Sequence, residues 1–235
     1  MNFSVKNILF IVTYILLMLK SGELVMTTHF IAIEGPIGVG KSSLAQAISD
    51  HFQYHLLNEI VGENPFLSKF YENIEEWSFQ TEMFFLCNRF KQLEDIREHY
   101  INKNKPVVSD YHMFKNLIFA HRTLKQDHYE KYQQIFQILN ESLPKPNIVI
   151  YLHASLDTLH KRIAKRGREF EKNISSLYLQ NLSMDYENYL KQFEIEHPET
   201  TVLRINGDEV DFVDNKEDLK NILANIEKLL IKGVK

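Results

Sequence analysis

The stretch His29-Phe-Ile-Ala-Ile-Glu-Gly-Pro-Ile-Gly-Val-Gly-Lys-Ser-Ser43 decides the fold of this chain. Residues 29–34 form a short apolar run that is typical of a buried strand, and residues 42–52 have the apolar spacing of a helix. Between them lies the pattern Gly35-x-x-x-x-Gly40-Lys41-Ser42, in the strand–loop–helix context that a phosphate-binding loop requires. The alternative, a chance glycine-rich turn, does not explain why the pattern lies between these two elements.

The chemistry of this loop points to a nucleoside triphosphate. Glycines let backbone N–H groups turn inward around phosphate oxygens, and the N-terminus of the following helix adds partial positive charge. Lys41 would reach the terminal phosphates, and the Ser42 hydroxyl would ligate Mg²⁺. We expect phosphate contacts along the whole loop, from Gly35, Gly38, Val39, Gly40, Lys41, Ser42 and Ser43.

Strand and helix patterns alternate along the rest of the chain. We expect strands at 29–34, 54–58, 106–109, 148–152 and 201–205, and helices at 42–52, 77–102, 114–124, 128–143, 155–165, 175–193 and 216–231. Strands separated by helices are typical of a parallel sheet that is covered on both faces. We therefore predict an α/β fold, a three-layer α/β/α architecture with a five-stranded parallel sheet, in one domain over residues 26–235.

The first 25 residues fall outside this pattern. Residues 8–19 are nearly continuous hydrocarbon, which is short for a membrane span of about 20 residues and closer to the core of a signal peptide. Export would separate a triphosphate-dependent protein from its triphosphate, and Met26 directly precedes the first core strand. We interpret residues 1–25 as an extension that the native protein lacks, and we expect membrane contact only if the segment is present.

Composition excludes some classes of protein. The chain has 27 basic and 31 acidic residues, so nothing favours binding of a nucleic-acid polymer. Cys87 is the only cysteine, which precludes a disulfide within the chain and fits a reducing compartment such as the cytoplasm. Because Cys87 lies in an apolar helical run, we expect a buried and unreactive thiol.

A phosphate loop alone does not separate a kinase from a GTPase or a motor ATPase, although a motor usually needs a longer chain. Glu59 follows the second expected strand, where open α/β sheets bind ligands, and could accept a proton from an acceptor hydroxyl. Arg162, Arg166 and Arg168 form a basic cluster that could close over a triphosphate. The alternatives are a solvated loop acid and a solvated helix end.

Seven ordered blocks of sequence resemble the deoxynucleoside kinase family, and within it most closely the bacterial deoxyguanosine kinases. The resemblance runs from about His29 to the C-terminus, in the blocks GPIGVGKSS, NEIVGENPFLSKFYEN, WSFQTEMFFLCNRFKQLE, SDYHMFKNLIFA, KPNIVIYL, KRIAKRGREFE and YLQNLSMDYENYL. It implies a P-loop kinase with an arginine-rich lid, usually a homodimer. Such enzymes transfer a phosphoryl group from ATP or another nucleoside triphosphate, with Mg²⁺, to the 5′-hydroxyl of a deoxynucleoside in nucleotide salvage.

The resemblance also implies roles for single residues. Glu59 matches the general base on the 5′-hydroxyl, and Tyr71 and Glu171 match the pair that binds the sugar 3′-hydroxyl. Asp208 matches a region near the donor base. The three arginines of the basic cluster match the lid, where they would act on the transferring group; with Lys41 and Glu59 they complete the expected catalytic set, namely Lys41, Glu59, Arg162, Arg166 and Arg168.

One departure from the family concerns charge. The family usually has an acid followed by Arg and Ser after the third strand, whereas this chain has Asp110-Tyr111-His112. Asp110 can keep the acid's role beside the substrate and, with Ser42, near Mg²⁺. The charge of the absent arginine must come from elsewhere, either from the lid or from Lys115.

A second departure concerns specificity. Glu82 stands where the family commonly reads the base with a glutamine, and Arg89 lies two turns further along the same helix face. A carboxylate can accept from both guanine N1–H and the 2-amino group, while Arg89 could donate to O6 and N7. We therefore expect a deoxyguanosine kinase. The alternatives are a Glu82–Arg89 pair without a role in recognition, a broader purine or mixed deoxynucleoside kinase, and a non-catalytic triphosphate-binding regulator.

Overall fold

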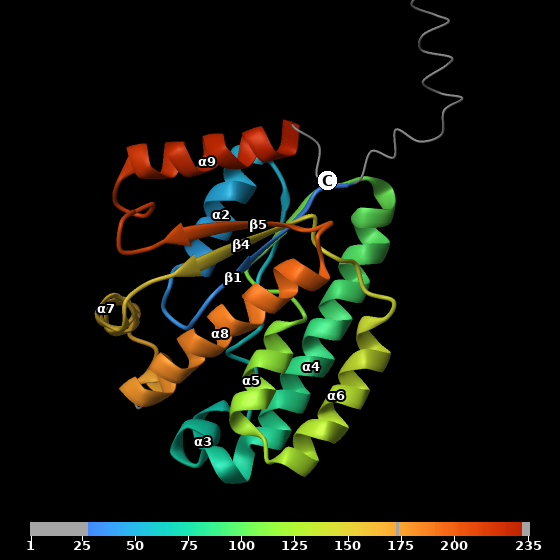
Figure 1. The fold of residues 1–235 in the computed structure, drawn as a ribbon, viewed down its shortest axis with the longest axis vertical. Helices are drawn as coiled ribbons and strands as arrows, with labels where there is room; N and C mark the ends of the chain where they lie inside the picture. Colours follow the sequence, from blue (N-terminus) through green and yellow to red (C-terminus); the bar gives the residue numbers. More distant parts are fainter. Residues whose placement is uncertain (1–27, 173, 232–235) are drawn as a thin grey trace, which may run out of the picture.

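The fold is centred on one parallel sheet of five strands. The computed structural model describes residues 28–172 and 174–231, so the expected N-terminal extension lies outside the described residues (Figure 1). The sheet has the order β2-β3-β1-β4-β5 and every neighbouring pair is parallel. Its strands are β1 (Phe30–Glu34), β2 (His55–Leu57), β3 (Val107–Ser109), β4 (Ile148–His153) and β5 (Thr201–Asn206). The predicted five-stranded parallel sheet is confirmed.

Helices cover both faces of the sheet. They are α2 (Lys41–Phe52), α3 (Leu67–Glu72), α4 (Ile74–His99), α5 (Lys115–Thr123), α6 (Gln126–Asn140), α7 (Leu156–Arg166), α8 (Ser176–Glu196) and α9 (Lys216–Ile231), with 3₁₀ turns at Ile101–Lys103 and Glu169–Glu171. Figure 1 shows α2 and α9 on one side of the sheet, and α4, α5, α6 and α8 on the other. This is the predicted three-layer α/β/α arrangement.

Alternation along β4 explains how one strand serves two cores. Ile148, Ile150 and Leu152 pack with residues of α2 and α9, whereas Val149 and Tyr151 pack with residues of α8. Both sets are buried, because successive side chains of a strand point to opposite faces. A strand buried on both faces reads as a continuous apolar run, which is why this segment was readily predicted.

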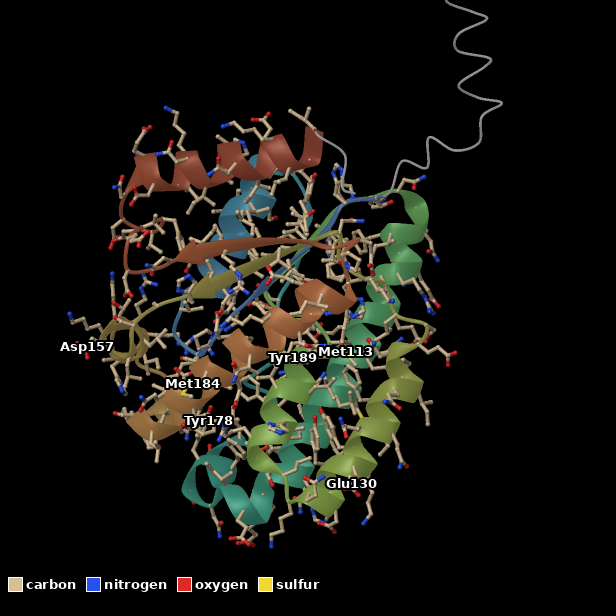
Figure 2. The ribbon with its side chains drawn as sticks, viewed as in Figure 1. Met113, Glu130, Asp157, Tyr178, Met184 and Tyr189 are labelled. Carbon is tan, nitrogen blue, oxygen red and sulfur yellow. The ribbon has the colours of Figure 1, made fainter. Side chains whose placement is uncertain are left out.

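Helix α8 has a core face and a solvent face. Figure 2 labels Tyr178, Met184 and Tyr189 along it. The Tyr189 ring stacks on Phe114 with 5.2 Å between ring centroids, whereas Met184 is 56% exposed.

Within the described residues, no helix combines the length and the apolar character that a membrane span requires.

Capping residues set several helix boundaries. The Ser155 hydroxyl accepts from the backbone N–H of Thr158, as expected for the N-cap of α7, and Gly167 ends that helix with φ +67°. Helix α4 begins three residues earlier than expected because Asn73 caps it by accepting from Glu76 N.

The short helix α3 was not predicted. The prediction for Cys87 was wrong, because its thiol is exposed on α4.

Candidate active site

A cavity of about 790 Å³ lies at the carboxyl ends of the strands. Residues that follow β1, β2, β3 and β5 line it, together with side chains from α3, α4, α5, α7 and the turn after α7. Ligands of open α/β sheets bind at this edge. The expected phosphate loop, acceptor residues and lid therefore meet around one space.

The phosphate loop has the backbone that its glycines predict. Gly35, Gly38 and Gly40 have φ values of +146°, +85° and +108°, and a Cβ atom at Gly35 would lie 2.1 Å from the Leu152 carbonyl oxygen. Gly35 and Val39 thus support the loop from behind, Val39 being buried in the core. The cavity side of the loop is formed by Gly38, Gly40, Lys41, Ser42 and Ser43.

The Lys41 ammonium group folds back onto its own loop. Its Nζ donates to the carbonyl oxygens of Gly35 and Pro36 at 2.7 and 3.0 Å. Burial, and after it the charge of nearby Lys115, lowers the pKa of Lys41 to about 7. An incoming phosphate would add negative charge beside this group, to the charges of Glu34, Glu59 and Asp110.

Ser42 and Asp110, the residues expected at a metal ion, are brought together. Ser42 Oγ donates to Asp110 Oδ2 at 2.5 Å, and Asp110 Oδ1 accepts from Glu59 N at 2.7 Å. No group of three or more His, Cys, Asp or Glu side chains is placed to hold a metal in the described part of the chain. One hydroxyl and one carboxylate fit Mg²⁺, which usually binds one or two carboxylates and takes its other ligands from phosphates and water.

Glu59 is held between two cations. Its Oε1 accepts from Arg89 Nε at 3.0 Å and also from Nη2, and its Oε2 accepts from Lys115 Nζ at 2.6 Å. Its side chain is only 9% exposed. Burial alone would raise the pKa of Glu59, but the charges of Lys115 and Arg89 hold it well below its usual range. Glu59 is therefore ionised and can accept a proton.

Glu82 lies at another part of the cavity wall in a different environment. It is 2% exposed, its Oε1 accepts from Thr123 Oγ1 at 3.2 Å, and its Oε2 has no partner among the described residues. Burial raises the pKa of Glu82 to about 7. Arg89, which we expected to act beside Glu82, donates instead to Glu59 and to Asn116 Oδ1.

The sequence analysis did not identify several residues around Glu82. Phe85 and Phe119 line the cavity with Glu82, as does Thr81, whose hydroxyl is buried without a partner within the described residues. Helical spacing was the available signal: Phe85 follows Glu82 by three residues, and Phe119 follows Lys115 by four. No comparable signal marked Thr123, because it contacts Glu82 from a different helix.

The lid arginines bind an acid of their own segment. Arg166 donates to both carboxylate oxygens of Glu171, the shortest contact being 2.6 Å, and Arg168 lies 3.5 Å from the same carboxylate. Tyr71 reaches this region from α3, where its ring lies parallel to that of Phe170 with 6.3 Å between centroids. Burial and the Glu171 charge raise the pKa of Tyr71. The structure therefore brings the expected sugar-binding pair, Tyr71 and Glu171, to one wall of the cavity.

Arg162 lies beneath the phosphate loop. Its Nη1 donates to the Val39 carbonyl oxygen and its Nη2 to the Gly207 carbonyl oxygen, both at 2.9 Å. In this arrangement the guanidinium joins the phosphate loop to the segment between β5 and α9. Arg162 also lines the cavity, so it remains within reach of a bound triphosphate.

The segment after β5 contributes to the cavity, but not through Asp208. The Asp208 carboxylate accepts from Ser155 N at 2.7 Å and from Ser155 Oγ at 2.9 Å, so it fixes the start of α7. Residues 211–214, a few positions further on, line the cavity instead.

Residues 215–218 match Asn-Lys-x-Asp, the pattern of guanine-reading GTPases, a match that the sequence analysis did not identify. Asn215 Oδ1 accepts from the backbone of Glu217 and Asp218, and the Asp218 carboxylate accepts from Asp211 N. The stretch therefore stabilises the start of α9.

A family model decides what this arrangement is. The model for deoxynucleoside kinases matches residues 31–231, which include the phosphate loop, Glu59, Glu82 and the lid. The chain belongs to the deoxynucleoside kinase family.

Relatives of this deoxynucleoside kinase span nearly the same length. It is 54% identical to deoxyguanosine kinase of Bacillus subtilis (strain 168) over 205 residues, which cover 87% of this chain and 99% of that protein. It is 28% identical to the deoxyadenosine/deoxycytidine kinase of the same organism, covering 85% and 92% of the two chains. The solved structure of deoxyadenosine kinase from M. mycoides with dCMP and dCDP matches with a TM-score of 0.73 at 27% identity, covering 85% and 99%.

Membership gives the cavity its general chemistry. The protein is a phosphotransferase of the P-loop kinase fold, and a kinase of this family binds a nucleotide donor and a deoxynucleoside acceptor. The phosphate loop is accordingly the expected donor half of the cavity, and Glu59 and Glu82 mark the expected acceptor half.

Proposed function

We propose that this kinase phosphorylates deoxyguanosine, transferring the γ-phosphoryl group of ATP to the 5′-hydroxyl to give dGMP. The observation that carries the choice of base is Glu82, a buried carboxylate on the cavity wall with one oxygen unpartnered among the described residues. A buried polar atom without a partner is costly unless a ligand satisfies it. The 54% identity to the Bacillus subtilis deoxyguanosine kinase supports the same acceptor.

Guanine complements this end of the cavity. Its N1–H and 2-amino groups are adjacent donors, and an ionised carboxylate accepts both. A guanidinium has five N–H donors, and Arg89 uses three of them on Glu59 and Asn116. The two that remain could donate to guanine O6 and N7. Adenine presents an acceptor at N1, which would face a carboxylate lone pair, whereas hypoxanthine keeps N1–H and O6.

At the reacting end of the cavity, the two salt bridges of Glu59 support its role as the general base. Glu59 accepts the proton of the 5′-hydroxyl, and the 5′-oxygen bonds to the γ-phosphorus. The bond from that phosphorus to the bridging oxygen breaks, and the nucleoside diphosphate leaves. Lys41 holds the terminal phosphates, and Arg166 and Arg168 would exchange Glu171 for the transferring group as the lid closes.

Several finer features belong to the same proposal. Ser42 and Asp110 would hold Mg²⁺ on the donor phosphates, where the ion neutralises charge. We also propose that residues 26–235 form the kinase domain. Because the reaction needs ATP, we propose that the enzyme acts in the cytoplasm. A homodimer would use the outer side of α4 near Phe84 and the exposed Cys87. Sedimentation velocity tests the dimer.

The decisive experiment is a radiolabelled-ATP assay with the four natural deoxynucleosides and deoxyinosine. We expect deoxyguanosine to have the largest kcat/KM, deoxyinosine to follow, and deoxyadenosine and the pyrimidines to be poor substrates. Similar kcat/KM values for deoxyadenosine and deoxyguanosine would instead indicate a broader purine kinase. Triphosphate binding without turnover of any nucleoside would indicate a non-catalytic regulator.

A further inference from the structure

Lys115 is a buried cation of the cavity to which the proposed reaction assigns no role. It is the first residue of α5, is 6% exposed and lines the cavity. Its Nζ lies 2.6 Å from Glu59 Oε2, and the same ammonium group lies 5.4 Å from the centre of the Phe119 ring. A buried lysine is rare unless it is paired, so the contact with Glu59 defines where this charge lies.

The ammonium group of Lys115 lies between the donor and acceptor halves of the cavity. On the acceptor side it contacts Glu59 directly. On the donor side it lines the same cavity as Lys41 and Ser42, and Glu59 is joined to Ser42 through Asp110, whose carboxylate accepts from both. Lys41 belongs to the phosphate loop, so a phosphoryl group in transit between the two halves would pass next to Lys115.

In this structure the three lid arginines are bound to other groups. The Arg166 and Arg168 side chains contact Glu171, and the Arg162 guanidinium donates to loop carbonyls. The position directly after Asp110 is filled by Tyr111, whose buried ring carries a hydroxyl that donates to Gln92 Oε1 at 2.9 Å. That side chain packs in the core beside α4 and not in the cavity, so position 111 does not supply a cation.

The donor count of Lys115 leaves capacity for a substrate. An ammonium group has three N–H donors, and one of them is used on Glu59 among the described residues. We propose that Lys115 is a catalytic cation, which orients Glu59 and donates its free N–H groups to the phosphoryl group as this passes to the 5′-oxygen. The proposal rests on the proposed function for its acceptor, the 5′-hydroxyl.

The charge balance of the transfer explains why a cation is needed there. Glu59 becomes neutral when it takes the hydroxyl proton, while the equatorial oxygens of the moving phosphoryl group keep their negative charge. The Lys115 ammonium group would then shift its hydrogen bonds from the Glu59 carboxylate, which is losing its charge, to a phosphoryl oxygen, which keeps its charge. Such an interaction is stronger in the transition state than in the ground state, which is the condition for raising kcat.

The test is Lys115→Met, which keeps the length of the side chain and removes its charge. We expect kcat for deoxyguanosine to fall about 10²- to 10³-fold, as for loss of one electrostatic group in a dry site, with KM changed less than fivefold. Lys115→Arg, which keeps the positive charge, should recover at least tenfold in kcat over Lys115→Met.

The matched control is Lys125→Met, the same substitution at an exposed lysine that pairs with Glu75. It should leave kcat and KM unchanged. If Lys115→Met does not fold, Lys115→Gln makes the same test with a neutral donor. The proposal is overturned if the neutral variant keeps a third or more of kcat, or if the neutral and arginine variants lose the same share of kcat. An inactive wild-type protein would instead refute the proposed function.

Discussion

Glu59 and Glu82 mark the two proposed ends of the acceptor half of the cavity, and the two side chains have opposite properties. Glu59 is bound by Lys115 and Arg89, which hold its pKa well below the usual range. Glu82 accepts one hydrogen bond from Thr123, and burial raises its pKa to about 7. The residue type is the same and both side chains are nearly inaccessible, so the difference comes from the neighbours alone.

This contrast separates the roles of the two ends. A carboxylate that is already ionised and oriented by two cations is ready to accept a proton, but its oxygens are committed to those partners. A carboxyl group with an unpartnered oxygen has its hydrogen-bonding capacity free for a base. Pairs of titratable groups with pKa values pushed apart mark such a division of roles.

The largest expected effect is at Glu59. Glu59→Gln removes the proton acceptor and leaves the shape of the cavity, so we expect kcat to fall about 10³- to 10⁴-fold. Steady-state kinetics with deoxyguanosine measures the loss, and equilibrium dialysis should show that the nucleoside still binds. The roles inferred for the two ends would be wrong if kcat stayed within tenfold of the wild-type value.

A smaller effect, on specificity and not on rate, is expected at Glu82. Glu82→Gln presents one donor and one acceptor where the carboxylate presented two acceptors, which suits adenine better than guanine. We expect the ratio of kcat/KM for deoxyguanosine to that for deoxyadenosine to fall about 10²- to 10³-fold. Asn88→Asp, on the same helix, is a control for altered charge and should leave the ratio unchanged. An unaltered ratio in Glu82→Gln would refute the proposed recognition of guanine.

The pKa of Glu82 adds a dependence of specificity on pH. Above pH 7 the carboxylate is ionised and accepts from guanine; below pH 7 the protonated carboxyl has one donor and one acceptor and suits adenine. Arg89, Lys115 and Thr123 oppose protonation, whereas Glu59 favours it. The deoxyguanosine-to-deoxyadenosine ratio of kcat/KM should therefore rise up to about tenfold per pH unit around pH 7. In Glu82→Gln the ratio should be flat with pH; a pH-dependent ratio in that variant would assign the effect to another group.

More of the fold than of the site could be predicted from the sequence. Strands such as Ile148–His153 are continuous apolar runs between a Pro-rich breaker and a helix cap, so local pattern was sufficient. The phosphate loop was equally local, because its glycines, Lys41 and Ser42 are adjacent in the chain. The short α3 escaped prediction, since six residues give too few turns for a helical period.

Contacts between distant segments were the part that sequence could not supply. Thr123 and Glu82 are 41 positions apart, and Lys115 and Glu59 are 56 apart. Lys115 was one of two possible sources of charge in the sequence, and only the folded structure brings it to Glu59, in the segment after β2. Arg89 shows the same limit: its helix face was predicted, but its partner in this structure, Glu59, belongs to another segment.

The smallest expected effect is at Tyr71, which lines the cavity with Glu171. Tyr71→Phe removes one hydroxyl that would bind the sugar 3′-hydroxyl and keeps the ring against Phe170. Loss of one such hydrogen bond is worth about 1 kcal/mol, so we expect KM for deoxyguanosine to rise about fivefold with kcat nearly unchanged. With 2′,3′-dideoxyguanosine, which lacks the 3′-hydroxyl, wild-type and Tyr71→Phe enzymes should have equal KM values. A fivefold difference that persists with the dideoxy substrate would mean that Tyr71 acts through the lid and not through the sugar, because only a direct contact disappears with the hydroxyl that it binds.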